Sequence, residues 1–288
     1  MTTKLPYLNV GCGFSFHEDW TNIDFVSTGE GVIAHNLLKG IPFPDSTFEV
    51  VYHSHVLEHF SQTDGKKFIS ECYRVLKNGG ILRIAIPDLE KIINEYTRLL
   101  SKLKEKGKDA YLDASYDWIL LELYDQTIRN QSGGNMVEYL KKEPIVNEDF
   151  ILERCGYEVR SIITSLRESG KGNSGTSETK SGGILQRLKF LYATIKSFRH
   201  TYRDKLIRRV LGEEYYYYEI GKFRSSGEIH QWMYDEYSLK RLLNQVGFEK
   251  VRVGSAHDSQ IHQWDKFGLE TIDGNVRKPD SLFIEATK

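Results

Sequence analysis

The sequence predicts an α/β fold, in which short buried strands alternate with amphipathic helices. The apolar residues 4–10 have the length and composition of a strand, and residues 11–13 (Gly-Cys-Gly) then allow a sharp turn. Further apolar runs recur within residues 21–86 and 248–286, with helical periodicity between them. The long middle, residues 95–225, shows several helical patterns and is too large to be a loop.

The first strands are short and closely spaced. After the strand at 4–10, we expect strands at 21–25 and 32–35. Asp24 stands at the carboxyl end of the second strand, where an acid suits the hydroxyls of a nucleotide ribose. The interval from Gly11 to Asp24 is shorter than the roughly 20 residues of a dinucleotide-binding fold, so a turn rather than a full helix joins these strands.

A regular alternation of strand and helix follows. Residues 48–53 read as a fully apolar strand, and the apolar positions of residues 62–76 fall on one face of a helix. Residues 78–80 (Asn-Gly-Gly) are expected to end that helix before a strand at 81–86. Residues 88–104 then have a good amphipathic period.

The rest of the chain divides into an insertion and a return to the core. The sequence predicts a core made of residues 1–94 and 226–288, with a helical insertion or substrate cap at 95–225. Within these parts we expect helices at 111–128, 149–167 and 238–246, a flexible glycine- and serine-rich loop at 168–183, and strands at 248–254 and 281–286.

Residues 184–211 predict a basic amphipathic helix. Such a helix can make weak peripheral contact with an anionic membrane or bind a phosphorylated ligand, and it can equally be a cap helix with a solvated basic face.

Composition narrows the class of protein. The net charge of −1 gives the whole molecule no electrostatic match to nucleic acid. Cys12, Cys72 and Cys155 show neither metal-ligand spacing nor a disulfide framework, which suits a reducing compartment. The first strand begins too soon for a secretory signal, and no apolar run approaches the roughly 20 residues of a membrane span. We therefore expect a cytoplasmic protein.

Five motifs occur in order between residues 8 and 80. They are Leu8-Asn9-Val10-Gly11-Cys12-Gly13, Ile23-Asp24, Ile41-Pro42-Phe43-Pro44-Asp45-Ser46-Thr47-Phe48-Glu49, Leu57-Glu58-His59 and Leu76-Lys77-Asn78-Gly79-Gly80. Together they closely resemble the class I S-adenosylmethionine-dependent methyltransferases, in particular their small-molecule branch. Two positions depart from the family pattern: Asn36 stands where many relatives carry an acid, and Glu49 replaces the usual aspartate. The third glycine of a dinucleotide fingerprint is absent because Phe16 occupies its place, which argues against NAD or FAD.

The resemblance implies a Rossmann-like, seven-stranded, mostly parallel sheet with an antiparallel last strand, plus a largely helical insertion. It implies S-adenosyl-L-methionine as the cofactor, held by the glycine turn, the acid after the second strand, and residues after the third and fourth strands. The cofactor-binding residues expected on this basis are Asn9, Gly11, Cys12, Gly13, Asp24, Asn36, Leu37, His53 and Ser54.

Methyl transfer to an oxygen of high pKa requires a base, for which histidine is suited. His230 is the leading candidate, because Glu228 lies two residues before it and would share its face in an extended segment. His55 is the second candidate, while His53, His59 and His262 are also available. Residues 55–59 also spell H-x-x-E-H, an inverted zinc-peptidase pattern. Their position directly after a strand of a cofactor-binding half favours the methyltransferase, so we predict no metal.

The predicted function is transfer of a methyl group to a small molecule. Residues 227–235 and 277–282 resemble uncharacterised bacterial methyltransferases associated with surface-polysaccharide biosynthesis, which implies a hydroxyl of a sugar or of a lipid-linked glycan precursor as acceptor. Methylation of another small metabolite and a catalytically inactive cofactor-binding protein are the alternatives. A nucleic-acid methyltransferase is disfavoured, because the chain lacks an N/D-P-P-Y/F motif and its positive charge is confined to one helix.

Overall fold

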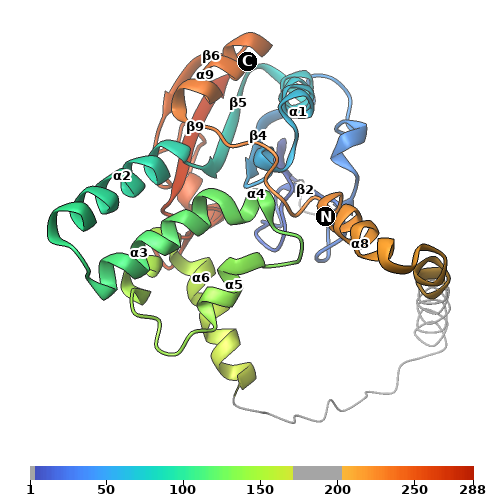
Figure 1. Ribbon diagram of the computed structural model, residues 1–288. Coiled ribbons are helices and arrows are strands. Elements are labelled where there is room, and N and C mark those ends of the chain that lie inside the picture. Colours follow the sequence, from blue (N-terminus) through green and yellow to red (C-terminus); the bar gives the residue numbers. More distant parts are fainter. Residues whose placement is uncertain (1–3, 171–202) are drawn as a thin grey trace.

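The computed structural model describes residues 4–170 and 203–288 and is built around one seven-stranded sheet (Figure 1). The strand order is β3-β2-β1-β4-β5-β9-β6, and β9 runs antiparallel to both of its neighbours while the other pairs are parallel. The predicted fold class is thereby confirmed. The strands are β1 Tyr7–Val10, β2 Thr21–Asp24, β3 Val32–Ala34, β4 Phe48–Ser54, β5 Leu76–Pro87, β6 Glu249–Val253 and β9 Ser281–Thr287.

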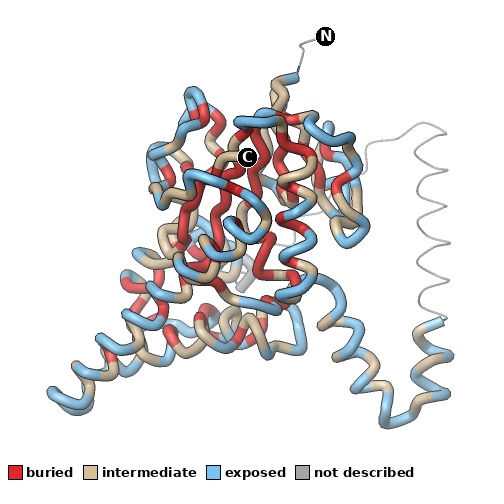
Figure 2. Tube along the Cα trace, turned by 90° about the horizontal axis from the view of Figure 1, so that it is seen from above, coloured by how far each residue is buried: buried red, intermediate tan, exposed pale blue. Residues whose placement is uncertain are grey.

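Two helices cover one face of the sheet. Helices α1 (Gln62–Val75) and α9 (Glu236–Val246) contact each other and contribute buried residues to the same core cluster as β1, β4, β5 and β9. Figure 2 shows the buried residues concentrated along the central strands. A sheet covered on both faces needs strands that are apolar throughout, which explains the continuous apolar runs in the sequence.

An aromatic segment near the C-terminus covers the opposite face. The 3₁₀ helix η5 (Trp264–Phe267) packs its two rings against Trp20 and Tyr52. A small hairpin of β7 (Thr271–Ile272) and β8 (Asn275–Val276) follows it. Between η5 and β7, Leu269 and Glu270 line a cavity at one edge of the sheet.

The middle of the chain forms a helical lobe with its own core. Trp118, Ile119 and Ile151 are fully buried in this lobe, together with Ile92 and Leu99 from the helix that follows β5. The lobe contains α2 Leu89–Lys106, α3 Ala110–Leu120, the π-helix η3 Leu121–Asp125, α4 Gln126–Ile128, α5 Gly134–Leu140 and α6 Glu148–Gly170. The predicted helix at 111–128 is thus interrupted by a π-helical turn.

Helix α6 is broken at Gly156, whose φ of 67° is left-handed. A Cβ there would lie 2.5 Å from the carbonyl oxygen of Arg277, so only glycine lets the two segments approach. The break brings the second half of α6 over the carboxyl edge of the sheet.

Several predicted boundaries shift. Helix α1 ends at Val75 and β5 begins at once, so residues 78–80 lie in an irregular start of that strand instead of ending the helix. Residues 168–170 finish α6, and the rest of the predicted loop at 168–183 lies outside the described residues. Of the predicted basic helix, the part from 203 to 211 is described and is helical.

The remaining short helices are η1 Leu37–Lys39, η2 Leu57–His59, η4 Gly212–Glu214 and α8 Tyr215–Arg224. Helix α8 carries the run of four tyrosines, of which Tyr216 and Tyr217 are exposed. Among the described helices, none has the length and apolar character needed to cross a membrane.

Candidate functional site

A cavity of about 510 Å³ opens where β1, β4 and β5 reach their carboxyl ends, with α6 on its far side. Its volume lies within the range of small-molecule sites, and the edge is the one where open α/β sheets bind ligands. Its lining residues are Asn9, Gly11, Cys12, Gly13, Phe14, Ser15, Tyr52, Ser54, His55, Ala85, Tyr157, Glu158, Ser161, Ile162, Leu269, Glu270, Arg277, Lys278, Ser281 and Phe283.

The glycine turn after β1 forms one wall of this cavity. Gly11 has a φ of 65°, and a Cβ there would lie 2.4 Å from Cγ2 of Val56. Gly13 has a φ of 52°, and no atom lies within 4 Å of the place where its Cβ would be. The backbone amides of Gly11 and Cys12 both donate to the carbonyl of Ile23, at 2.8 and 3.2 Å. The turn is therefore held against β2, with open space over Gly13.

Asp24 is fixed beside this turn. Its Oδ2 accepts a hydrogen bond of 2.8 Å from the amide of Gly13, while its Oδ1 has no donor among the described residues. Phe25, directly after it, is 64% exposed. A carboxylate oxygen without a partner, next to an exposed aromatic ring, suits the hydroxyls and base of a nucleoside.

Two other expected cofactor residues support the backbone around the turn. The side-chain amide of Asn9 donates to the carbonyl of Ser15 at 3.0 Å and to Oδ1 of Asn22 at 3.3 Å. Burial, reinforced by the charge of Asp24, raises the pKa of the Cys12 thiol to about 11, so this thiol stays protonated. Asn9 and Cys12 both line the cavity, as expected, while holding its shape.

Asn36 and Leu37 lie outside the cavity lining. The side-chain oxygen of Asn36 caps η1 by accepting from the amide of Leu38 at 3.0 Å, which leaves its amide group available. The side chain of Leu37 packs against the core. Their contact with the cofactor stays a prediction.

The expectation that His53 faces the cavity is wrong. Side chains alternate along a strand, and in β4 Tyr52 and Ser54 face the cavity while His53 points to the opposite face. There its ring packs against Phe68, with centroids 5.0 Å apart, and neither ring nitrogen has a hydrogen-bond partner. Burial lowers the pKa of His53 to about 4.

This buried histidine predicts acid sensitivity. An unfolded chain takes up a proton near pH 6.5, whereas the folded chain does so only near pH 4, so stability falls as the pH falls through this window. We expect the wild type to lose roughly 3 kcal/mol more than His53→Leu between pH 6.5 and pH 4. Urea unfolding at both pH values measures this, with the exposed His262→Leu as the control. An equal loss in wild type and His53→Leu would contradict the prediction.

The two expected bases occupy different places. His55 lines the cavity, with Nε2 at 2.9 Å from Oγ of Ser281 and Nδ1 at 3.2 Å from Oε1 of Glu58. His230 is buried and does not line the cavity. Burial lowers its pKa to about 3 despite the opposing charge of Glu58, so its imidazole is neutral.

The predicted pairing of Glu228 with His230 is wrong. Oε1 of Glu228 accepts from the amide of Gly133 at 3.1 Å and lies 3.8 Å from Arg129. The carboxylate beside His230 is instead Glu58, from a segment distant in the sequence. Glu228 thus ties the segment before α9 to the helical lobe.

The far wall of the cavity was not predicted from the sequence. Tyr157 and Glu158 come from α6, after its break, and Arg277 and Lys278 come from the loop before β9. Nζ of Lys278 lies 2.6 Å from Oε2 of Glu158, which joins these two segments across the wall. Gly156 in a helical pattern was the one local signal for this approach.

Parts of this chain are similar in sequence to known methyltransferases. Residues 26–84 match a family model described as a methyltransferase domain. A stretch of 56 residues is 39% identical to a probable S-adenosylmethionine-dependent methyltransferase of Mycolicibacterium smegmatis. That stretch covers 19% of this chain and 21% of the relative, so the chain matches only about a fifth of the relative's length.

Solved methyltransferase structures overlap with the whole chain. The alignment with one from Archaeoglobus fulgidus covers 100% of this chain and 87% of that protein's chain, at 13% identity and a TM-score of 0.37. One from Mesorhizobium loti covers 99% and 92%, at 11% identity and a TM-score of 0.36. Both TM-scores are below 0.5, so the fold assignment rests on the strand order and register.

The sequence matches support a class I methyltransferase domain with S-adenosylmethionine as its cofactor, as predicted. The geometry of the site also fits this cofactor. The open space over Gly13, the unpartnered Oδ1 of Asp24 and the polar end of β4 supply the surface, the acceptor oxygen and the cavity that it needs. The match to residues 26–84 does not include the glycine turn at residues 11–13. The position of that turn in the cavity wall comes from the structure.

Proposed function

We propose that this protein transfers a methyl group from S-adenosylmethionine to a hydroxyl of a sugar or glycan precursor bound in the cavity. The observation that carries the proposal is the position of His55. Its imidazole lines the same cavity as the glycine turn, with a buried carboxylate behind it. No other histidine lines that cavity within the described residues.

The cavity wall supports a sugar as acceptor. Tyr157 and Phe283 offer apolar ring surfaces, while Glu158, Ser161 and Glu270 offer hydrogen-bonding groups. Sugars bind between flat apolar surfaces and polar groups that fix the hydroxyls, because a sugar ring has apolar C–H faces and a polar rim. Arg277 and Lys278 lie on the same wall and offer further donors to sugar hydroxyls, with the charge of Lys278 balanced by Glu158.

S-adenosylmethionine supplies a methyl group on a positively charged sulfur. The protein has to align the acceptor oxygen and keep water out. His55 accepts the hydroxyl proton at Nε2, which Ser281 contacts before the acceptor binds. Glu58, at 3.2 Å from Nδ1, stabilises the imidazolium that results. Asp24 and the turn at residues 11–13 hold the nucleoside part of the cofactor.

Calorimetric titration with S-adenosylmethionine and S-adenosylhomocysteine tests the cofactor site. We expect wild-type binding in the micromolar range and a loss of about 10- to 100-fold in Asp24→Ala, because a charge-assisted hydrogen bond is removed and the turn at Gly13 loses its anchor. Asp113→Ala, exposed on α3, is the matched control and should bind as the wild type does.

Unchanged affinity in Asp24→Ala would contradict the ribose role. A screen of nucleotide sugars and glycans, read as release of S-adenosylhomocysteine, then tests the acceptor class. Turnover confined to other small molecules would favour another metabolite, and binding without turnover on any acceptor would favour an inactive cofactor-binding protein.

A further inference from the structure

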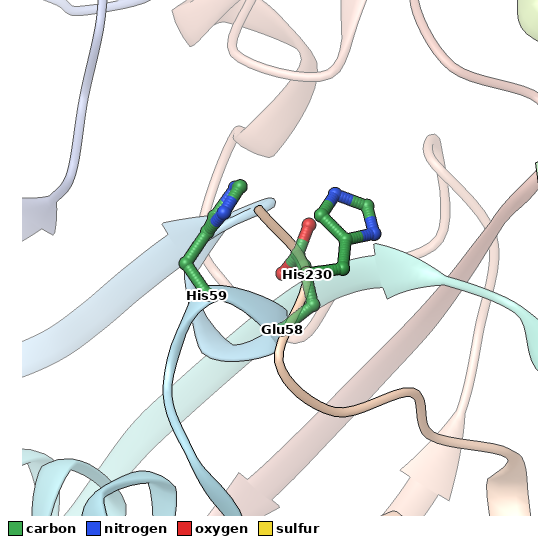
Figure 3. Close-up of side chains that lie close together, drawn as sticks. All are labelled: Glu58, His59 and His230. Carbon is green, nitrogen blue, oxygen red and sulfur yellow. The ribbon is translucent and has the colours of Figure 1, made fainter. Parts of the chain in front are cut away.

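Three side chains that do not line the cavity lie close together: Glu58, His59 and His230 (Figure 3). Each offers one potential ligand atom, and these atoms all lie within 4.8 Å of one another. Glu58 and His59 belong to η2, and His230 comes from the segment before α9. The methyl-transfer chemistry proposed above uses Glu58 only through His55 and leaves the other two without a role.

Glu58 is the central group of this cluster. Its side chain is 1% exposed, and its Oε1 lies 3.2 Å from Nδ1 of His55. Neither carboxylate oxygen has a further partner among the described residues. A buried carboxylate with a single histidine contact keeps unfilled acceptor positions, which is costly, and a bound cation removes that cost.

The backbone holds the two segments in this arrangement. The amide of Gln231 donates to the carbonyl of Glu58 at 2.7 Å, and its side-chain amide donates to the carbonyl of His59 at 2.8 Å. The amide of His230 donates to the carbonyl of Gln126 at 2.9 Å, which ties it to the helical lobe. His230 is therefore placed opposite Glu58 by contacts that do not involve its ring.

The histidine tautomers suit ligation. Nδ1 of His59 lies 3.1 Å from the carbonyl oxygen of Ile229. A carbonyl only accepts, so Nδ1 carries the proton and Nε2 has a free lone pair, which is the usual arrangement of a metal-binding histidine. No hydrogen bond to the ring of His230 occurs among the described residues, so a ring nitrogen is also available as a ligand.

We infer that Glu58, His59 and His230 together bind one divalent transition-metal ion, with zinc the best match. Two imidazoles and one carboxylate form a known zinc ligand set that leaves a fourth position open. Bonds of about 2.0–2.2 Å to a tetrahedral ion place the ligand atoms about 3.3 Å apart. The three ligand atoms lie within 4.8 Å of one another, so they would move closer together on binding. The ion neutralises Glu58 and links η2 to the segment before α9.

This site differs from the zinc-peptidase pattern that residues 55–59 spell. In that pattern both histidines ligate the ion from one helical face. Here His55 has a φ of 53°, and η2 spans only Leu57–His59, so His55 and His59 do not share a helical face. His55 keeps its place in the cavity. The inferred site replaces the expectation that the protein binds no metal.

Tag-free full-length protein tests the inference without any methyl acceptor. After chelator treatment and dialysis, titration with Zn²⁺ should show one ion per chain, and Co²⁺ should give the visible absorption of a low-coordinate site. Glu58→Gln and His230→Gln should each weaken zinc binding by more than about 100-fold, since each removes a direct ligand. The exposed His262→Gln is the matched control and should bind as the wild type does.

A folding control keeps the test decisive. His59 is the most exposed of the three ligands, so His59→Gln is the variant that should disturb the fold least. Near-ultraviolet circular dichroism of each variant shows whether it has folded. Stripped wild type that binds neither Zn²⁺ nor Co²⁺ would overturn the inference. Equal zinc binding by wild type and by folded Glu58→Gln, His59→Gln and His230→Gln would also overturn it. Because the readout is metal content, its failure is distinct from failure of the methyl-transfer proposal.

Discussion

Replacing Arg83 with methionine is expected to lower the free energy of unfolding by about 3–5 kcal/mol, because one partner of a buried ion pair is removed. Arg83 is fully buried in β5, where its guanidinium binds Glu270 bidentately and donates to Oε1 of Glu285 at 2.8 Å. It also donates to the carbonyl of Ser255 at 2.8 Å. Without it, Glu270 is left buried with no basic partner in the described part of the chain, whereas Glu285 keeps Arg252.

Urea unfolding at pH 7 measures this loss. Arg98→Met is the matched control, because Arg98 pairs with Glu95 on the surface of α2 and such pairs contribute at most about 1 kcal/mol. Adding Glu270→Gln to Arg83→Met should recover part of the loss, since it removes the stranded charge. If Arg83→Met lost no more stability than Arg98→Met, the ion pair between Arg83 and Glu270 would not be what holds the aromatic segment around η5 on the sheet.

Replacing His55 with glutamine is expected to lower methyl-transfer turnover by about 10²–10⁴-fold, the usual contribution of a general base. Glutamine keeps a hydrogen bond to Ser281 but cannot accept the acceptor's proton. Cofactor affinity should stay within about twofold of the wild type, because the glycine turn and Asp24 are untouched. The rate of S-adenosylhomocysteine release with the acceptor found in the sugar screen, and calorimetry with S-adenosylmethionine, measure the two quantities.

The matched control for this experiment is Ser281→Ala, which removes the partner of Nε2 and leaves the imidazole in place. Its turnover should fall far less than that of His55→Gln. His230→Gln is measured in the same assay after calorimetry has shown that it binds the cofactor. If His230→Gln abolished turnover and His55→Gln did not, His230 would be the base. The pH dependence of the rate in Glu58→Gln would then show whether Glu58 acts on either imidazole.

The strands and the glycine turn of the cofactor half could be predicted because their signals are local. An apolar run followed by glycine at a left-handed φ specifies the end of β1 whatever packs on it, and Asp24 follows at the end of β2. The position of His53 could also have been predicted. Strand alternation places it on the face opposite Tyr52 and Ser54, so His53 and Ser54 could not both face the cofactor.

The long-range partners had no such signal. Glu228 lies two residues from His230 and was the natural choice for its carboxylate, yet it binds Gly133 in the lobe. The irregular start of β5 shows the same limit, since Gly79 and Gly80 follow a helix as its terminator would but lie within β5, where both form backbone hydrogen bonds with Lys288. In each case a contact with a residue distant in the sequence determined the local structure, and the adjacent residues did not predict it.

Local patterns were enough to predict the strand-rich cofactor half, the glycine turn and the acid beside it, because period, apolar content and backbone freedom are properties of short segments. Which groups meet at the site depends on tertiary packing. It brought His59 against the carbonyl of Ile229, 170 residues away, and α6 against the loop at 277–278. Those contacts depend on how separate segments pack on a common sheet edge, which no local pattern encodes.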